Sequence, residues 1–140
     1  MKSVIYSLNK PDKGGVKPYI PIKLVHPNTG KSLYVNALLD SGADCCTLPS
    51  MISRTLGLKL DKEYESEGTT GISGEVLKTY THTLVVQVYD SGRTRIVRTM
   101  KIKVNSLERN DIPPLMGTES FLDQFNVSFN YLKGEIELSW

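Results

Sequence analysis

Apolar and polar residues alternate along most of the chain in short runs, and turn-forming residues separate these runs at regular intervals. The runs are rich in Val, Ile, Tyr and Thr, which favour β-strands, while Gly, Pro, Asn and Asp occupy the breaks. Because the breaks are short, neighbouring runs are expected to pair as hairpins. The pattern predicts an all-β fold with strands over residues 19–25, 32–39, 75–89, 94–104, 126–131 and 135–138, and with hairpin turns at 27–30, 90–93 and 133–134.

Two short stretches have the pattern of helices instead. Ser50 is placed to cap a helix over residues 51–56, and Gly57 would end it. Thr118 precedes a second such stretch, residues 119–124. Both helices are too short to organise the fold, so they are expected to pack at the edge of the sheets.

Length and composition fit one globular domain. The chain has 140 residues, of which 39% are apolar and 23% are charged, so a sizeable core needs no disulfide or metal. Residues 1–17 contain a break at Pro11–Gly15, which predicts an N-terminal arm of uncertain order. Residues 18–140 are predicted to form the domain itself.

Charge and cysteine content exclude several function classes. The net charge of +2 is too small to indicate nucleic-acid binding. Residues 93–103 carry five basic side chains and no acid, which suits either a patch for acidic partners or, as we favour, the solvated face of an edge strand. The two cysteines, Cys45 and Cys46, are adjacent and cannot easily form a disulfide, which favours a reducing compartment.

The chain shows no feature of export or of membrane insertion. Its first residues lack the apolar segment of a signal peptide, and no apolar run approaches the roughly 20 residues of a transmembrane helix. We expect a cytoplasmic or otherwise intracellular protein with no membrane partner. No His or Cys cluster has zinc-ligand spacing, so no metal is expected.

The most informative segment is Asp40-Ser41-Gly42, which directly follows the apolar run Ala37–Leu39. A carboxylate at the end of a buried strand is costly unless it is hydrogen-bonded or paired, so something must hold Asp40. A plain β-turn is the simpler interpretation, because Asp-Ser-Gly forms turns commonly. The same tripeptide at Asp90-Ser91-Gly92 lacks apolar flanks and is predicted to be a hairpin turn.

The surroundings of the first copy favour function. After Asp44 the chain returns to an apolar strand at residues 45–49, and a glycine-rich hairpin tip follows at 69–76. Later, Ile112–Gly117 forms an apolar segment that ends in glycine before the second predicted helix.

With these segments in this order, the chain resembles the retropepsin-like aspartic proteases, the single-domain relatives of retroviral protease. Residues 38–44 match the family's active-site loop in its Ser variant, 70–74 lie where the family has its flap, and 115–117 match the segment that threads beside the catalytic loop. The likeness covers about residues 18–138. It implies a closed-barrel-like acid-protease fold and an aspartic endopeptidase acting on peptide bonds of extended polypeptides.

The resemblance also implies roles for particular residues. Aspartic protease chemistry needs two carboxylates, and this chain supplies one, so the family's symmetric homodimer is implied. No organic cofactor and no metal are implied. The catalytic residue would be Asp40; loop support would come from Ser41 and Gly42, substrate binding from Ala43, Asp44, Gly71, Ile72, Ser73 and Gly74, and the site wall from Leu115, Met116 and Gly117.

Other interpretations remain open at this point. Retroviral members usually carry Arg after the apolar-apolar-Gly segment, where this chain has Thr118, which favours a catalytically silent dimerisation or peptide-binding module. A thiol protease using Cys45 or Cys46 with His82 lacks a recognisable third residue. A plain β-domain with a coincidental Asp-Ser-Gly is the remaining alternative.

Overall fold

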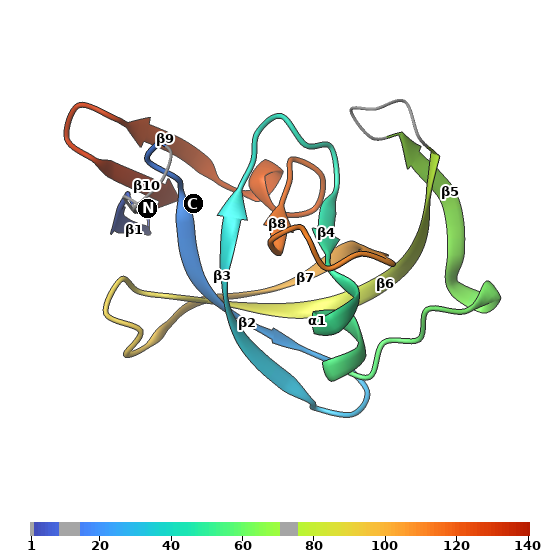
Figure 1. Ribbon diagram of the computed structural model, residues 1–140. Coiled ribbons are helices and arrows are strands. Elements are labelled where there is room, and N and C mark those ends of the chain that lie inside the picture. Colours follow the sequence, from blue (N-terminus) through green and yellow to red (C-terminus); the bar gives the residue numbers. More distant parts are fainter. Residues whose placement is uncertain (1, 9–14, 71–75) are drawn as a thin grey trace.

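The computed structural model describes residues 2–8, 15–70 and 76–140, and its regular secondary structure is mostly β-strand (Figure 1). The strands are β1 (Ser3–Ser7), β2 (Tyr19–Val25), β3 (Ser32–Leu39), β4 (Cys46–Leu48), β5 (Glu65–Thr70), β6 (Val76–Tyr89), β7 (Ile96–Leu107), β8 (Leu115–Met116), β9 (Asn126–Asn130) and β10 (Glu135–Ser139). The helices are α1 (Ser50–Thr55) and two 3₁₀ turns, η1 (Lys62–Tyr64) and η2 (Leu122–Gln124).

Six strands close into a barrel. They follow one another in the order β2-β3-β8-β4-β7-β6, and pairing between β2 and β6 completes the ring. Strand β5 extends this sheet beyond β6, and β1, β10 and β9 form a separate three-stranded sheet. The prediction of an all-β, closed-barrel-like fold is therefore confirmed.

The predicted hairpins are confirmed, with small shifts at their ends. Strands β2 and β3 have the predicted bounds and pair in register from Tyr19 with Leu38 to Val25 with Ser32. Strand β7 begins at Ile96 rather than at residue 94, because Thr94 and Arg95 belong to the turn and donate to the Asp90 carboxylate. Strand β9 ends at Asn130, whose side chain accepts a hydrogen bond from the Lys133 amide.

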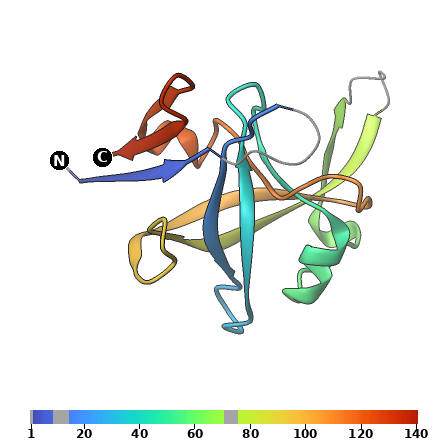
Figure 2. The same ribbon diagram turned by 60° about the vertical axis from the view of Figure 1, so that its left-hand side comes forward.

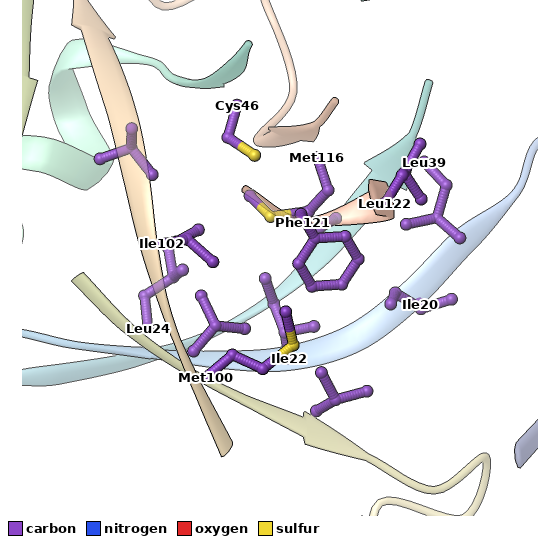
Figure 3. Close-up of a cluster of buried hydrophobic side chains, with 14 of the residues drawn as sticks. Ile20, Ile22, Leu24, Leu39, Cys46, Met100, Ile102, Met116, Phe121 and Leu122 are labelled. Carbon is purple, nitrogen blue, oxygen red and sulfur yellow. The ribbon is translucent and has the colours of Figure 1, made fainter. Parts of the chain in front are cut away.

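The core lies inside the barrel and continues beneath the smaller sheet. Along β2 the side chains of Ile20, Ile22 and Leu24 are fully buried, as the period of two in a strand requires. Phe121 lies among side chains from both layers, close to Met116 and Leu122 (Figure 3). The same burial leaves the outward-facing residues of β2 and β3 on the surface.

The first residues of the chain belong to this core. Strand β1 pairs with β10 from Ser3–Ser139 to Ser7–Glu135, and Val4, Tyr6 and Leu8 are buried. The Tyr6 hydroxyl donates to the Tyr89 carbonyl at 2.5 Å. Residues 3–7, which the sequence places within an N-terminal arm of uncertain order, therefore form a strand. The described residues include no helix long and apolar enough to span a membrane.

Both helix predictions need correction at their starts. Ser50 is the first residue of α1 rather than its cap, and the capping position is Pro49. The Asn110 side chain takes over the capping role, because its oxygen accepts from the Ser50 hydroxyl at 3.0 Å and from the Met51 amide at 2.8 Å. Thr118 begins a series of turns, and the only regular part of the predicted helix is the 3₁₀ turn Leu122–Gln124.

Candidate active site

The candidate site lies where the short strand β8 runs between β3 and β4. Strand β8 is parallel to β3, with Leu38 opposite Leu115 and Leu39 opposite Met116. On its other side, Leu115 pairs with Thr47 of β4 in antiparallel orientation. The loop 40–45 leaves the end of β3 and returns through β4, so it passes over the end of β8 (Figure 1).

Hydrogen bonds within this loop and to β8 hold Asp40 in place. Its amide donates to the Met116 carbonyl at 3.0 Å, and its own carbonyl accepts from the Ala43 amide at 3.2 Å. One carboxylate oxygen, Oδ1, accepts from the Gly42 amide at 2.9 Å. The other oxygen, Oδ2, has no hydrogen-bond partner in the described part of the chain, and the side chain is partly exposed. Asp40 therefore has a fixed carboxyl group with one oxygen available.

The second Asp-Ser-Gly has no free carboxylate oxygen at its aspartate, Asp90, and the prediction that it forms a hairpin turn is confirmed. Both carboxylate oxygens of Asp90 are used: Oδ1 accepts from the Thr94 amide at 2.7 Å, and Oδ2 accepts from the Thr94 hydroxyl at 2.7 Å. These bonds, led by the Thr94 hydroxyl, hold the pKa of the Asp90 carboxyl below its usual value. Asp90 is a structural acid that closes the β6–β7 turn.

Gly117 allows the loop and β8 to approach each other closely. A Cβ atom at this position would lie 2.4 Å from the Cys45 carbonyl oxygen and 2.7 Å from that of Ala43, both shorter than any real contact. The following amides complete the junction, since Thr118 donates to Ala43 at 2.9 Å and Glu119 donates to Asp44 at 2.9 Å. The sequence predicts Gly117 only as part of the site wall. The requirement for glycine at this position comes from a contact between two backbone segments, which no local sequence pattern reveals.

The Thr118 side chain makes one long contact with the loop. Its hydroxyl donates to the Ser41 carbonyl at 3.4 Å, near the limit of a hydrogen bond. Among the described residues, no cationic side chain lies within ion-pair distance of Asp40 or Asp44. The loop of the single chain is thus held by backbone bonds rather than by an arginine.

Eight of the predicted site residues lie together at this junction, in the segments 40–44 and 115–117. The carbonyls of Ala43 and Asp44 are already bonded to 118 and 119, and the Ala43 amide donates to the Asp40 carbonyl. The groups left open to a ligand are therefore the amide and the exposed carboxylate of Asp44. Met116 is fully buried and supports the loop through its carbonyl rather than lining a surface. The predicted flap residues Gly71, Ile72, Ser73 and Gly74 lie outside the described residues.

The arrangement does not support a thiol protease. Cys46 and His82 both lie opposite Val104 but on strands separated by β7, which puts their Cα atoms about 10 Å apart. His82 is nearly buried, its Nε2 lies 2.8 Å from the Lys59 carbonyl and its ring stacks on Tyr64. Burial raises the pKa of both thiols, so neither cysteine is activated as a nucleophile.

Comparison with solved structures identifies the fold of this chain. No model of a known protein family matches the chain, and no curated protein matches its sequence. A retropepsin-like aspartic protease from Rickettsia conorii has a similar crystal structure, with a TM-score of 0.68 and 22% sequence identity over 98% of this chain and 89% of that chain. EIAV protease complexed with the inhibitor HBY-793 matches at 24% identity over 77% of this chain and 88% of that chain. Its TM-score of 0.48 is too low to carry an argument. The first likeness establishes that this chain has the retropepsin-like fold.

Proposed function

We propose that this chain is an aspartic endopeptidase that works as a symmetric homodimer, with Asp40 of each copy supplying one of the two catalytic carboxylates. The observation that carries the proposal is the state of Asp40: its carboxylate is fixed through Oδ1 while Oδ2 remains without a partner in the described residues. The fold supports it, because the likeness to the protease from Rickettsia conorii extends over nearly the whole chain.

Two such carboxylates, brought together by a twofold axis, would share one proton because like charges at short distance cannot both ionise easily. The ionised Asp40 accepts a proton from water as this water attacks the amide carbon. The protonated Asp40 of the second copy donates a hydrogen bond to the carbonyl oxygen and stabilises the developing charge. The two residues exchange roles by symmetry, and no metal or organic cofactor takes part.

The remaining roles follow from position around Asp40. Ser41 and Gly42, both exposed, would hold the two loops against each other across the axis. The amide and the side chain of Asp44, with Ala43 beside them, would bind the backbone of an extended substrate as an added strand. Residues 71–74 would close over the bound peptide and exclude water.

A catalytically silent dimerisation or peptide-binding module is the second candidate. The observation that favours it is Thr118, whose side chain gives the loop a single 3.4 Å contact in place of the arginine pairing usual in retroviral relatives. This difference concerns how firmly two copies associate, whereas the carboxyl group of Asp40 itself is intact. Sedimentation separates the two questions, because a strict monomer cannot bring two copies of Asp40 together.

The test compares the wild type with Asp40→Asn on an unfolded protein substrate across pH 4–7, at a concentration where sedimentation shows the dimer. Asn keeps the shape and accepts the Gly42 hydrogen bond, but it cannot act as the ionised base. We expect the variant to lose activity by about 10³-fold or more, and the wild type to show a bell-shaped pH profile.

Asp90→Asn is the matched control, because the substitution is the same, the tripeptide is the same and this acid only closes a turn. It should retain activity close to that of the wild type. If Asp40→Asn cleaves as well as the wild type, the proposed chemistry is wrong. If the dimer forms and neither the wild type nor any variant cleaves the substrate, the chain is a catalytically silent module.

A further inference from the structure

The outer face of β2 and β3 lies between β1 and the turn that joins β6 to β7 (Figure 2). The residues of this face line a groove that is separate from the candidate active site. It consists of two adjoining depressions of about 90 and 360 Å³. Both are lined by Pro21, Asn36 and Arg93, so these three residues form the shared middle of the groove.

Arg93 reaches this position through an unfavourable backbone conformation. Its φ is +58°, in the left-handed region that costs a residue with a side chain about 1 kcal/mol or more. Gly92 precedes it and does not adopt that conformation. The strained conformation therefore falls on an arginine, although the neighbouring glycine could adopt it more easily. In this conformation the Arg93 guanidinium donates to the Asn36 side chain at 2.8 Å.

Two cations lie at the groove: Arg93 lines it, and Lys23 lies beside it over the Tyr34 ring. No carboxylate of the described residues lies within ion-pair distance of Arg93 or Lys23. Asp90 is the nearest acid in the turn, and both of its oxygens are already bonded to Thr94, with Arg95 as a further donor. Most of the Arg93 donors thus remain available to a ligand.

An aromatic wall adjoins the cations. Tyr34 is 65% exposed, its hydroxyl lies 3.3 Å from that of Tyr89 and the two rings are tilted at 5.6 Å. The Lys23 ammonium lies 5.1 Å from the centre of the Tyr34 ring. These contacts hold a large exposed ring in one place, which reduces the entropy that a ligand packing on it would otherwise cost.

The groove is connected to the candidate active site along one strand. Tyr34, Asn36 and Leu38 face outward on β3 and lead to Asp40 at its end, because alternate residues of a strand share a face. Asp40 lies four positions after Asn36, which corresponds to about 13 Å along the strand. An extended peptide covers this distance with about four residues.

We propose that the groove binds an acidic, extended polypeptide segment, with a carboxylate seated on Arg93 and a neighbouring side chain packed on Tyr34. This part of the inference rests on the proposed function: the bound segment belongs to the substrate of the protease. Its Asp or Glu lies about four residues from the cleaved bond. The fixed guanidinium would select carboxylates through paired hydrogen bonds.

The first test measures binding, with the inactive Asp40→Asn protein and a fluorescent ten-residue peptide that carries two glutamates. Its twin with two glutamines is the neutral probe. We expect the acidic peptide to bind about fivefold more tightly at low salt, with the difference decreasing as salt rises. Arg93→Gln should abolish the preference. Arg95→Gln removes the same charge from the same turn but does not line the groove, so it should leave the preference largely intact.

Arg93→Gly adds an independent readout. Glycine relieves the left-handed strain, so this variant should be more thermally stable than the wild type while losing the preference for the acidic peptide. Equal binding of both peptides would overturn the inference, and so would equal losses in Arg93→Gln and Arg95→Gln. A preference that depends on Arg93, without any cleavage by the wild type, would support the groove and refute the proposed protease activity.

Discussion

Replacing Gly117 by alanine is the most direct test of how the candidate active site is assembled. The added Cβ would lie 2.4 Å from the Cys45 carbonyl oxygen, 2.7 Å from that of Ala43 and 2.8 Å from the Cys45 carbonyl carbon. All three are backbone atoms, so no side chain can move aside. To reach even 3.0 Å, the Cys45 oxygen must retreat by 0.6 Å (3.0 − 2.4), and the loop that carries Asp40 must move with it.

The expected cost follows from this contact. Overpacking in a well-packed interior costs about 1–3 kcal/mol, and two rigid carbonyls put this site at the upper end, about 3 kcal/mol. With an unfolding entropy of about 2.1 cal/mol/K per residue, a chain of 140 residues loses about 10 °C in melting temperature. The φ of Gly117 is not in the left-handed region, so the loss would come from the contact alone.

Differential scanning calorimetry of matched glycine variants measures this effect. A Cβ on Gly15 meets nothing within 4 Å, and one on Gly92 meets only Thr94 Cγ2 at 3.6 Å. Gly15→Ala and Gly92→Ala should therefore melt within a few degrees of the wild type. If Gly117→Ala melts where these two do, the close approach of β8 and the loop is not as described, and the account of how Asp40 is held is wrong.

Three further substitutions test other parts of the fold. Burial keeps the pKa of His82 below its usual 6.5, so the unfolded chain binds more protons than the folded chain as the pH falls through this value. The wild type should therefore lose stability relative to His82→Gln between pH 7.5 and 5, as measured by urea denaturation at each pH. Asn110→Ala removes the side chain that caps α1 and should cost about 1 kcal/mol in the same assay. Phe121→Ala should cost about 4 kcal/mol, because the ring is fully buried.

The chain itself provides controls for Asn110→Ala and Phe121→Ala. Asn126→Ala removes an exposed amide with no hydrogen-bond partner in the described residues, and Leu132→Ala removes a side chain that is 99% exposed. Both should change stability by less than about 0.5 kcal/mol. A pH dependence that is identical in the wild type and His82→Gln would show that this histidine titrates as freely in the fold as in the unfolded chain.

Local signals predict the hairpins well, because the turn chemistry and the alternation lie in the same few residues. The bounds of β2 and β3 follow directly from the alternating run at 19–25 and 32–39 and from the turn between them. The failures involve distant partners. Ser50 has the residue type of a cap, but Asn110, 60 residues later, supplies the capping oxygen. Strand β1 is visible only once its pairing with β10 is known.

The candidate site likewise has features that local sequence predicts and features that depend on distant residues. The segment around Asp40 stands out because an acid follows an apolar strand. The partner segment 115–117 is visible as an apolar run that ends in glycine, but only the family resemblance indicates that it lies beside Asp40. The steric need for Gly117 and the bonds from 118 and 119 to the loop depend on tertiary contact, which leaves no local trace. Arg93 is similar, since its role depends on a backbone conformation that its sequence context does not indicate.

The position of β8 between β3 and β4 also has a consequence for the order of folding. Leu38 pairs with Leu115, 77 residues away (115 − 38), whereas the β2–β3 and β6–β7 hairpins close over short turns. Contacts this distant in sequence form slowly, because the loop entropy must be overcome before they stabilise the chain. We therefore expect the hairpins to form first and the loop at Asp40 to remain unsupported until β8 inserts. During synthesis, the loop at Asp40 would gain its support only after β8 (Leu115–Met116) has emerged. On the proposed function, a nascent chain could therefore not cleave itself or its surroundings before that point.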